Sequence, residues 1–217
     1  MTAARRTSPL QNRVTPFGEI VATPERGLFM GNRGGCFHDD RQQLTSRRWA
    51  TKQWITCKTD YKGKRRPLME PGCYTELFFL DEAVAFAAGH RPCALCRRPD
   101  FDRFTAAWVR ANPVLARSEK LRVATLDSAL HGERLTPERT KRTFDVTLGS
   151  LPDGTFVTFD GVEAWLVLRG ALRRWSFGGY DASRTLDPRT PAQVLTPPSV
   201  VRAFDAGYRP SVHPAAG

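Results

Sequence analysis

The stretch over residues 74–98, YTELFFLDEAVAFAAGHRPCALCRR, constrains the fold of this chain more than any other. Its first residues are aromatic and apolar, which is typical of a buried strand. Asp81 can then cap the start of an alanine-rich helix, and Gly89 can end that helix. Cys93 and Cys96 follow directly, and this Cys-x-x-Cys spacing supplies half of a tetrahedral zinc site. The stretch therefore predicts a strand and a short helix that lead into a metal-binding turn.

The cysteines favour a metal site over a disulfide framework. There are five of them: Cys36, Cys57, Cys73, Cys93 and Cys96. An odd number, in a chain whose first residues lack the apolar core of a secretory signal, is typical of metal ligands or free thiols. No apolar run is long enough to span a bilayer. We therefore expect a cytoplasmic protein with no membrane partner.

The charge balance is strongly basic. The chain has 33 Lys and Arg against 22 Asp and Glu, a net charge of +11. Residues 1–70 hold 14 of these cations but only 6 of the anions, so most of the excess lies in the first third. Such an excess favours nucleic acid as the partner. The alternative is a solvated basic surface that maintains solubility.

The pattern of elements predicts an α+β fold: a small zinc-stabilised hairpin and helix module, then helices, then a small antiparallel β region. We expect a disordered tail over residues 1–12, the zinc-binding module with its following helices over 13–135, and the β-rich region over 136–217. The expected strands are 15–23, 27–30, 49–61, 74–80, 144–148, 156–160, 164–168 and 171–177. The expected helices are 82–88, 101–111, 114–131 and 199–205.

The 74–98 stretch resembles the metal-binding module of the Ada-type DNA alkylation-repair proteins, which is also found appended to nucleases. The matching residues are Phe78, Phe79, Glu82, Ala83, Ala87, Ala88, Gly89, Arg91, Pro92, Cys93 and Cys96. The resemblance extends more loosely back to residue 30 and leaves the C-terminal part unmatched. It implies a structural zinc ion and a role in DNA repair or processing.

A structural zinc site needs two ligands besides the Cys-x-x-Cys pair. By composition alone, His38, Cys36, Cys57 and Cys73 are all candidates. The resemblance implies His38, because the Gly-Asn and aromatic-His of residues 31–38 are in register with an entry motif of such modules. Cys57, on an expected strand, completes the predicted set of His38, Cys57, Cys93 and Cys96. The chain lacks the Cys-x-x-x-Cys pair of Ada itself, which counts against methyl-acceptor activity.

Several cations are candidates for phosphate contacts. They are Arg33, Lys62, Lys64, Arg65, Arg66, Arg91, Arg97 and Arg98. Residues 47–66 also interleave cations with Trp49, Trp54 and Tyr61, a mixture that suits phosphate contacts and base stacking. An equally good interpretation places the two tryptophans in the core.

The leading hypothesis is a zinc-containing DNA-binding protein. An alternative is a DNA-acting enzyme, a nuclease or base-processing enzyme, with its active site in the C-terminal β region. The sequence shows no catalytic pair at a diagnostic spacing, so the catalytic residues of such an enzyme are unknown. A second alternative is a zinc-stabilised module that binds another protein.

Overall fold

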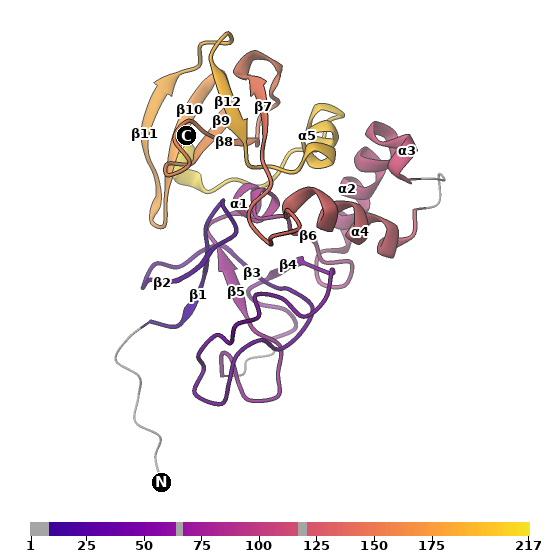
Figure 1. Cartoon of the computed structure of the whole chain (residues 1–217), viewed down its shortest axis with the longest axis vertical. Helices are drawn as coiled ribbons and strands as arrows, with labels where there is room; N and C mark the ends of the chain where they lie inside the picture. The colour runs from indigo at the N-terminus through magenta and orange to yellow at the C-terminus, as the bar shows by residue number, and fades with distance from the viewer. Residues whose placement is uncertain (1–8, 64–66, 117–120) are drawn as a thin grey trace.

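A computed structural model describes residues 9–63, 67–116 and 121–217, and it confirms the α+β class. Two six-stranded sheets are joined by a group of helices (Figure 1). The first sheet uses strands between residues 11 and 92, and the second uses strands between residues 144 and 194. Helix α1 (Glu82–Ala87) lies between them, and the other helices lie to one side (Figure 1).

The first sheet has the spatial order β2-β1-β5-β3-β4-β6. Its strands are β1 (Gln11–Val14), β2 (Ile20–Ala22), β3 (Phe29–Asn32), β4 (Ile55–Lys58), β5 (Leu77–Phe79) and β6 (Arg91–Pro92). The β1–β5 and β4–β6 pairs are parallel, and the others are antiparallel. The sheet thus brings β4 next to the two residues that precede the Cys-x-x-Cys turn.

Three predictions about this sheet are wrong in their bounds. The predicted strand over residues 15–23 is reduced to β2, because residues 15–19 form the turn that joins it to β1. Gln11 and Asn12 belong to β1, which pairs with β2, so the predicted disordered tail does not reach residue 12. The predicted strand over residues 49–61 is reduced to β4. The residues before β4 form a loop in which the Trp54 indole donates to the Thr51 carbonyl at 3.1 Å. The alternating pattern of that stretch reflects the inward packing of Trp54 and not a longer ladder.

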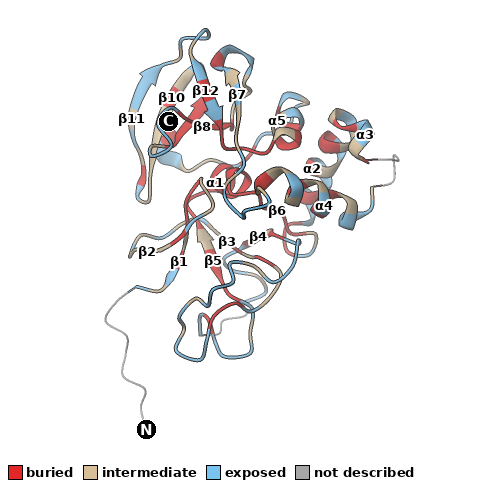
Figure 2. Ribbon diagram, in the orientation of Figure 1, coloured by how far each residue is buried: buried red, intermediate tan, exposed pale blue. Residues whose placement is uncertain are grey.

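Helix α1 begins and ends as predicted. The Asp81 carboxylate accepts the Val84 amide at 2.9 Å, which caps the first turn. Gly89 follows the helix with φ of +83°, the left-handed conformation that glycine adopts without steric strain. All six helical residues are buried, as the red ribbon of α1 in Figure 2 shows. Because the helix is so short, its stability depends on this packing.

The remaining helices share a second apolar core. They are α2 (Arg98–Ala111), α3 (Pro113–Ala116), α4 (Val123–Arg134) and α5 (Pro198–Asp205). Phe86 of α1 packs there against Phe104 of α2 and Phe204 of α5. Among the described residues, no helix has both the length and the apolar character needed to cross a membrane.

The second sheet is antiparallel throughout, with the spatial order β11-β10-β9-β8-β12-β7. Its strands are β7 (Phe144–Thr147), β8 (Phe156–Thr158), β9 (Trp165–Leu168), β10 (Ala171–Ser176), β11 (Gly179–Thr185) and β12 (Pro191–Val194). The predicted meander is confirmed for β8, β9 and β10. The sequence reading missed β11, which extends the meander, and β12, which inserts between β8 and β7.

The C-terminal region is anchored to the start of α1. The second oxygen of the Asp81 carboxylate accepts the Tyr180 hydroxyl at 2.7 Å and the His213 amide at 3.0 Å. One apolar cluster also contains Phe79 of the first sheet and Phe156 and Leu166 of the second. The two sheets therefore share a core, and the domain division that we predict at residue 135 falls in the connection between α4 and β7.

Candidate metal centre

Strand pairing brings Cys57 to the Cys-x-x-Cys turn. Thr56 of β4 lies opposite Pro92 of β6, and the Cys93 amide donates to the Thr56 carbonyl at 2.9 Å. Cys57 is the next residue of β4, so its side chain lies beside the turn. The reversal of the chain at Gly89 makes this pairing possible, because it returns the backbone from α1 to the edge of the sheet.

The sulfur atoms of Cys57, Cys93 and Cys96 form what we call the three-cysteine cluster. All three lie within 4.8 Å of one another, and the three residues are buried. The partly buried residues that pack around them are apolar or aromatic: Met30, Ile55 and Tyr61. The Leu95 amide points at the Cys93 sulfur at 3.4 Å. Sulfurs around a tetrahedral zinc ion lie about 3.8 Å apart, from Zn–S bonds of about 2.3 Å, so a small contraction would close the cluster on a metal.

The cluster is electrostatically prepared for a cation. Hydrogen bonds from the Cys57 and Cys96 thiols lower the pKa of Cys93 to about 2. The hydrogen bond to Cys93 correspondingly raises the pKa of Cys57 above its usual range. Cys93 is thus the thiol of the cluster that loses its proton most readily. A bound metal ion would displace the thiol protons and stabilise the thiolates.

The predicted ligand His38 does not belong to the cluster. Its Nδ1 lies 2.8 Å from the Thr75 hydroxyl, and its Nε2 lies 3.3 Å from the Glu70 carbonyl oxygen. Its nearest sulfur contact is with Cys36, at 3.7 Å. His38 also forms an isolated bridge with Leu44, which closes a loop beyond the end of β3. This prediction therefore needs correction, because the loop turns the histidine toward Thr75 instead of the cysteines.

The other alternative ligands are also elsewhere. Cys36 is exposed, and Cys73 is half-buried in a turn in which its amide donates to the Glu70 carbonyl. Among the described residues, the group that can hold a metal therefore consists of Cys57, Cys93 and Cys96 alone. Three protein ligands leave the fourth position of a tetrahedral ion to water or to another ligand.

Two of the predicted phosphate-binding arginines are buried in ion pairs. Arg91 donates from Nε and Nη2 to the two carboxylate oxygens of Asp127, at 2.8 and 2.9 Å. Arg97 contacts Glu82 at 2.6 Å and Asp100 at 2.8 Å. Their guanidinium groups are committed to carboxylates, so the prediction that they contact phosphate is wrong. They are structural, because each ion pair joins elements that are separate in the sequence.

The other predicted cations differ in their surroundings. Arg33 is buried, with its guanidinium carbon 3.9 Å from the centroid of the Trp54 ring, so it is also unavailable to an outer phosphate backbone. Arg98 is exposed and paired with Asp102 at 2.9 Å. Lys62 is exposed. Three further predicted residues lie outside the described part of the chain: Lys64, Arg65 and Arg66.

The structure adds cations that the sequence did not single out. Arg134, at the end of α4, lies 3.8 Å from the centroid of the same Trp54 ring, and Lys141 follows in the next loop. Both line one pocket with Arg33. No spacing pattern connects residues 33, 134 and 141, so only the fold could reveal their association.

Comparisons of this chain with protein-family models, with curated proteins and with solved structures find no match. The likeness to the Ada-type module thus remains a prediction from the sequence.

Proposed function

We propose that this chain is a zinc-containing nucleic-acid-binding protein, with DNA as its expected partner. The observation that carries the metal half of this proposal is the three-cysteine cluster, in which a third, sequence-distant cysteine completes the Cys-x-x-Cys pair. Thiolate ligands in a tetrahedral arrangement are characteristic of zinc. All five cysteines are free, which is consistent with the reducing cytoplasm. The setting in DNA repair or processing rests on the resemblance alone.

The zinc ion would act structurally. It would join β4 to the turn after α1, and so hold the first sheet against the helices. Metal-binding free energy at such a site adds to the free energy of folding. Metal analysis of the purified protein should give one zinc ion per chain, and an excess of chelator should lower the melting temperature.

The nucleic-acid half of the proposal rests on the excess of cations in residues 1–70. With Arg33, Arg91 and Arg97 buried, the described cations of this part of the chain that can reach phosphates along its outer surface are the exposed ones. They are Arg26, Arg41, Arg47, Arg48, Lys52, Lys58 and Lys62. Arg26 precedes β3 and Lys58 ends β4, while the others lie on the loops around β4, which Figure 2 shows as largely exposed ribbon below the first sheet.

Salt dependence tests this surface. Each phosphate contact contributes about 0.7–0.9 units to the slope of log K against log salt. The double variant Arg47→Ser with Lys62→Asn should therefore lower the slope by up to about 2, since asparagine tolerates the left-handed backbone at Lys62. The matched control, Arg103→Ser with Arg189→Ser, removes two exposed cations, one from α2 and one from the turn between β11 and β12, and should leave the slope unchanged. Equal slopes in both double variants would contradict the proposed surface.

A second candidate function is an enzyme that acts on DNA. The three-cysteine cluster leaves a coordination position for water, and catalytic zinc sites keep such a position open. Within the described residues, the C-terminal sheet contains no group of side chains that could hold a metal, so its predicted catalytic role gains no support. Zinc-loaded protein that cleaves a DNA oligonucleotide, with activity lost in Cys57→Ser, would favour this candidate.

A further inference from the structure

A pocket of about 650 Å³ opens beside the N-terminal sheet, where the loop after α4 meets the end of α1. Its lining contains five cationic side chains and one carboxylate: Arg33, Arg48, Arg134, Arg139, Lys141 and Glu19. Two tryptophans, Trp49 and Trp54, complete one wall, with ring centroids 5.8 Å apart. We call this space, together with the side chains of Arg33, Arg134 and Lys141, the cation pocket.

Arg33 donates only to uncharged acceptors. Its Nη2 bonds the Gly18 carbonyl at 2.8 Å, and its Nη1 bonds the Arg48 carbonyl at 3.4 Å. Its Nε donates to Nε2 of His90 at 3.3 Å. The pKa of His90 is lowered well below its usual value by burial and by the nearby Arg33, so the imidazole is neutral. A guanidinium that is only 2 % exposed thus lacks a carboxylate partner among the described residues.

Arg134 and Lys141 repeat this arrangement. Arg134 donates to the carbonyls of Gly89 and Lys52, both at 2.8 Å, while its Nε has no partner among the described groups. The Lys141 ammonium donates to the Ala87 carbonyl. A bridge between Leu135 and Lys141 fixes the loop that carries this lysine. These acceptors include carbonyls at the end of α1, whose partial negative charge is too small to neutralise three cations.

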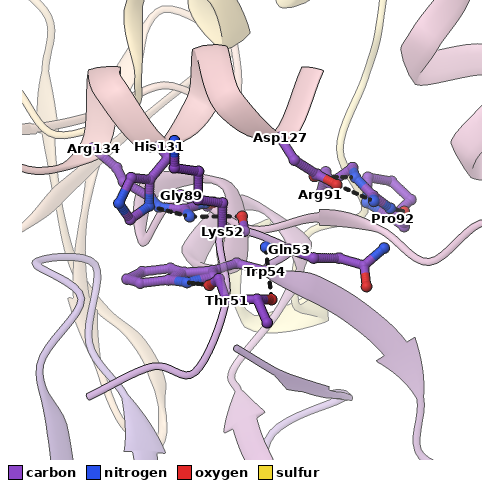
Figure 3. Close-up of polar contacts among 10 residues, drawn as sticks. All are labelled: Thr51, Lys52, Gln53, Trp54, Gly89, Arg91, Pro92, Asp127, His131 and Arg134. Atoms are coloured by element: carbon purple, nitrogen blue, oxygen red, sulfur yellow. Dashed lines mark hydrogen bonds and ion pairs between the residues drawn. The ribbon is translucent and has the colours of Figure 1, made fainter. Parts of the chain in front are cut away.

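The contrast with the rest of the fold is visible on a single helix. Figure 3 shows α4 carrying Asp127, which pairs with Arg91, and Arg134, which reaches only backbone carbonyls and His131. Buried arginines in proteins normally have carboxylate partners, since an unpaired charge away from water is costly. Arg91 and Arg97 follow that rule. The cation pocket is the place where the described fold departs from it.

The pKa of each cation in the pocket is lowered. Burial, and then repulsion from the neighbouring cations, lowers the pKa of Lys141 to about 7 and also lowers that of Arg134. Burial and the charge of Arg48 lower the pKa of Arg33. An anion in the pocket would reverse these effects, because it would supply the missing opposite charge.

We propose that the cation pocket binds a phosphoryl group. A phosphate ester carries close to two negative charges and three oxygen acceptors, which matches several converging donors better than a single carboxylate does. The space exceeds that of a bare ion, and the half-buried Trp49 offers an aromatic surface to the rest of the ligand. The ligand is either the terminal phosphate of a nucleic acid or a free phosphate ester. The inference stands apart from DNA binding through the exposed loops.

The first test is calorimetric titration of the full chain with inorganic pyrophosphate at constant ionic strength, with acetate as the monoanion control. Wild-type protein should bind pyrophosphate at least tenfold more tightly than acetate. Lys141→Met should weaken pyrophosphate binding at least tenfold, Lys141→Arg should retain most of it, and the exposed control Arg103→Met should match wild type. Equal affinity for pyrophosphate and acetate, or wild-type affinity in Lys141→Met, would overturn the proposal.

Lys141→Met is the preferred variant because it relieves repulsion among like charges and is expected to fold. Arg134→Met removes two hydrogen bonds to the backbone and risks unfolding, so circular dichroism would accompany it. Tight pyrophosphate binding by a folded Arg134→Met protein would also count against the pocket.

Competition experiments distinguish the two sources of the phosphoryl group, a nucleic-acid end and a free phosphate ester. A 5′-phosphorylated oligonucleotide that displaces pyrophosphate better than its 5′-hydroxyl form, with the difference lost in Lys141→Met, identifies a nucleic-acid end. Displacement by a nucleoside triphosphate, with both oligonucleotides equally weak, identifies a free phosphate ester. If neither oligonucleotide nor the nucleoside triphosphate displaces pyrophosphate, the pocket does not bind a phosphoryl group that is attached to a nucleotide. None of these results depends on the salt slope of DNA binding, so the two proposals can fail separately.

Discussion

The three-cysteine cluster and the cation pocket present opposite electrostatic problems. In the cluster, three sulfurs lie within 4.8 Å, and a metal cation would neutralise the negative charge that they acquire as their protons leave. In the pocket, Arg33, Arg134 and Lys141 gather positive charge, and none of them is bonded to a carboxylate among the described residues. At each site the folded chain brings chemically similar groups together: sulfurs in the cluster and cations in the pocket.

The difference lies in how each site is assembled. Two members of the cluster are three residues apart, and strand pairing adds the third. The pocket instead joins side chains from the residue after β3, from the end of α4 and from the following loop. A metal site can thus be recognised from local spacing, whereas an anion site made of separate cations emerges only in three dimensions.

The largest expected effect concerns the cluster. Cys93→Ser removes one of the three sulfur ligands, so the bound metal should be lost. We expect the melting temperature to fall by more than about 10 °C, given roughly 2–4 °C per kcal/mol for a chain of this size. Metal analysis and thermal denaturation measure both changes. Cys36→Ser, at an exposed cysteine outside the cluster, serves as the control and should alter neither.

The next prediction compares a paired arginine with the unpaired ones. Asp127→Asn leaves Arg91 buried without its counter-charge, which should cost about 3–5 kcal/mol of unfolding free energy. Asp102→Asn, which removes the exposed partner of Arg98, should cost about 0–1 kcal/mol. Chemical denaturation measures the two free energies. If both substitutions lower the free energy of unfolding by the same small amount, a buried arginine in this fold does not need a carboxylate partner. The lack of such partners in the cation pocket would then not indicate a bound anion.

The sequence predicted the elements around the cluster well because their signals are local. A capping aspartate, an alanine-rich stretch, a glycine and a Cys-x-x-Cys turn occupy consecutive positions, and each acts on its neighbours. Cys57 could also be predicted, through the resemblance and its place on a strand. The fourth ligand could not, since the position of His38 depends on a loop that closes against Thr75.

Charge composition was a poorer guide to individual residues. It could not distinguish the buried Arg91 and Arg97 from exposed cations, because their partners Asp127 and Glu82 are 36 and 15 residues away. The strand β12 was missed for a similar reason: it pairs with β7 and β8 only after the chain has completed the meander. Long-range pairing determines these features, and no local pattern records it.

The next prediction concerns the pH dependence of anion binding in the cation pocket. Burial, with Arg33 and Arg134, lowers the pKa of Lys141 from 10.5 to about 7, so the empty pocket loses this proton above neutral pH. The guanidinium groups of Arg33 and Arg134 stay charged over this range and His90 stays neutral, so Lys141 alone accounts for the change. Sulfate, whose charge is constant in this range, should bind up to tenfold more weakly for each unit from pH 7 to 9.

Calorimetry with sulfate at constant ionic strength measures this dependence, and Lys141→Met should flatten it. A sulfate affinity that stays constant or rises with pH would show that the lysine does not face the bound anion.

The smallest effect is expected at His38. His38→Gln removes the hydrogen bond to the Thr75 hydroxyl, so it should cost about 1 kcal/mol while the metal content stays at one ion per chain. Thr75→Val removes this hydrogen bond, and also the one that the Phe37 amide donates to the same hydroxyl at 2.9 Å, but it keeps the imidazole, so it is the control for metal content. If His38 moved to the cysteines when metal binds, His38→Gln would lower the metal content and Thr75→Val would not. Full metal content in both variants would confirm that three cysteines, without this histidine, hold the ion.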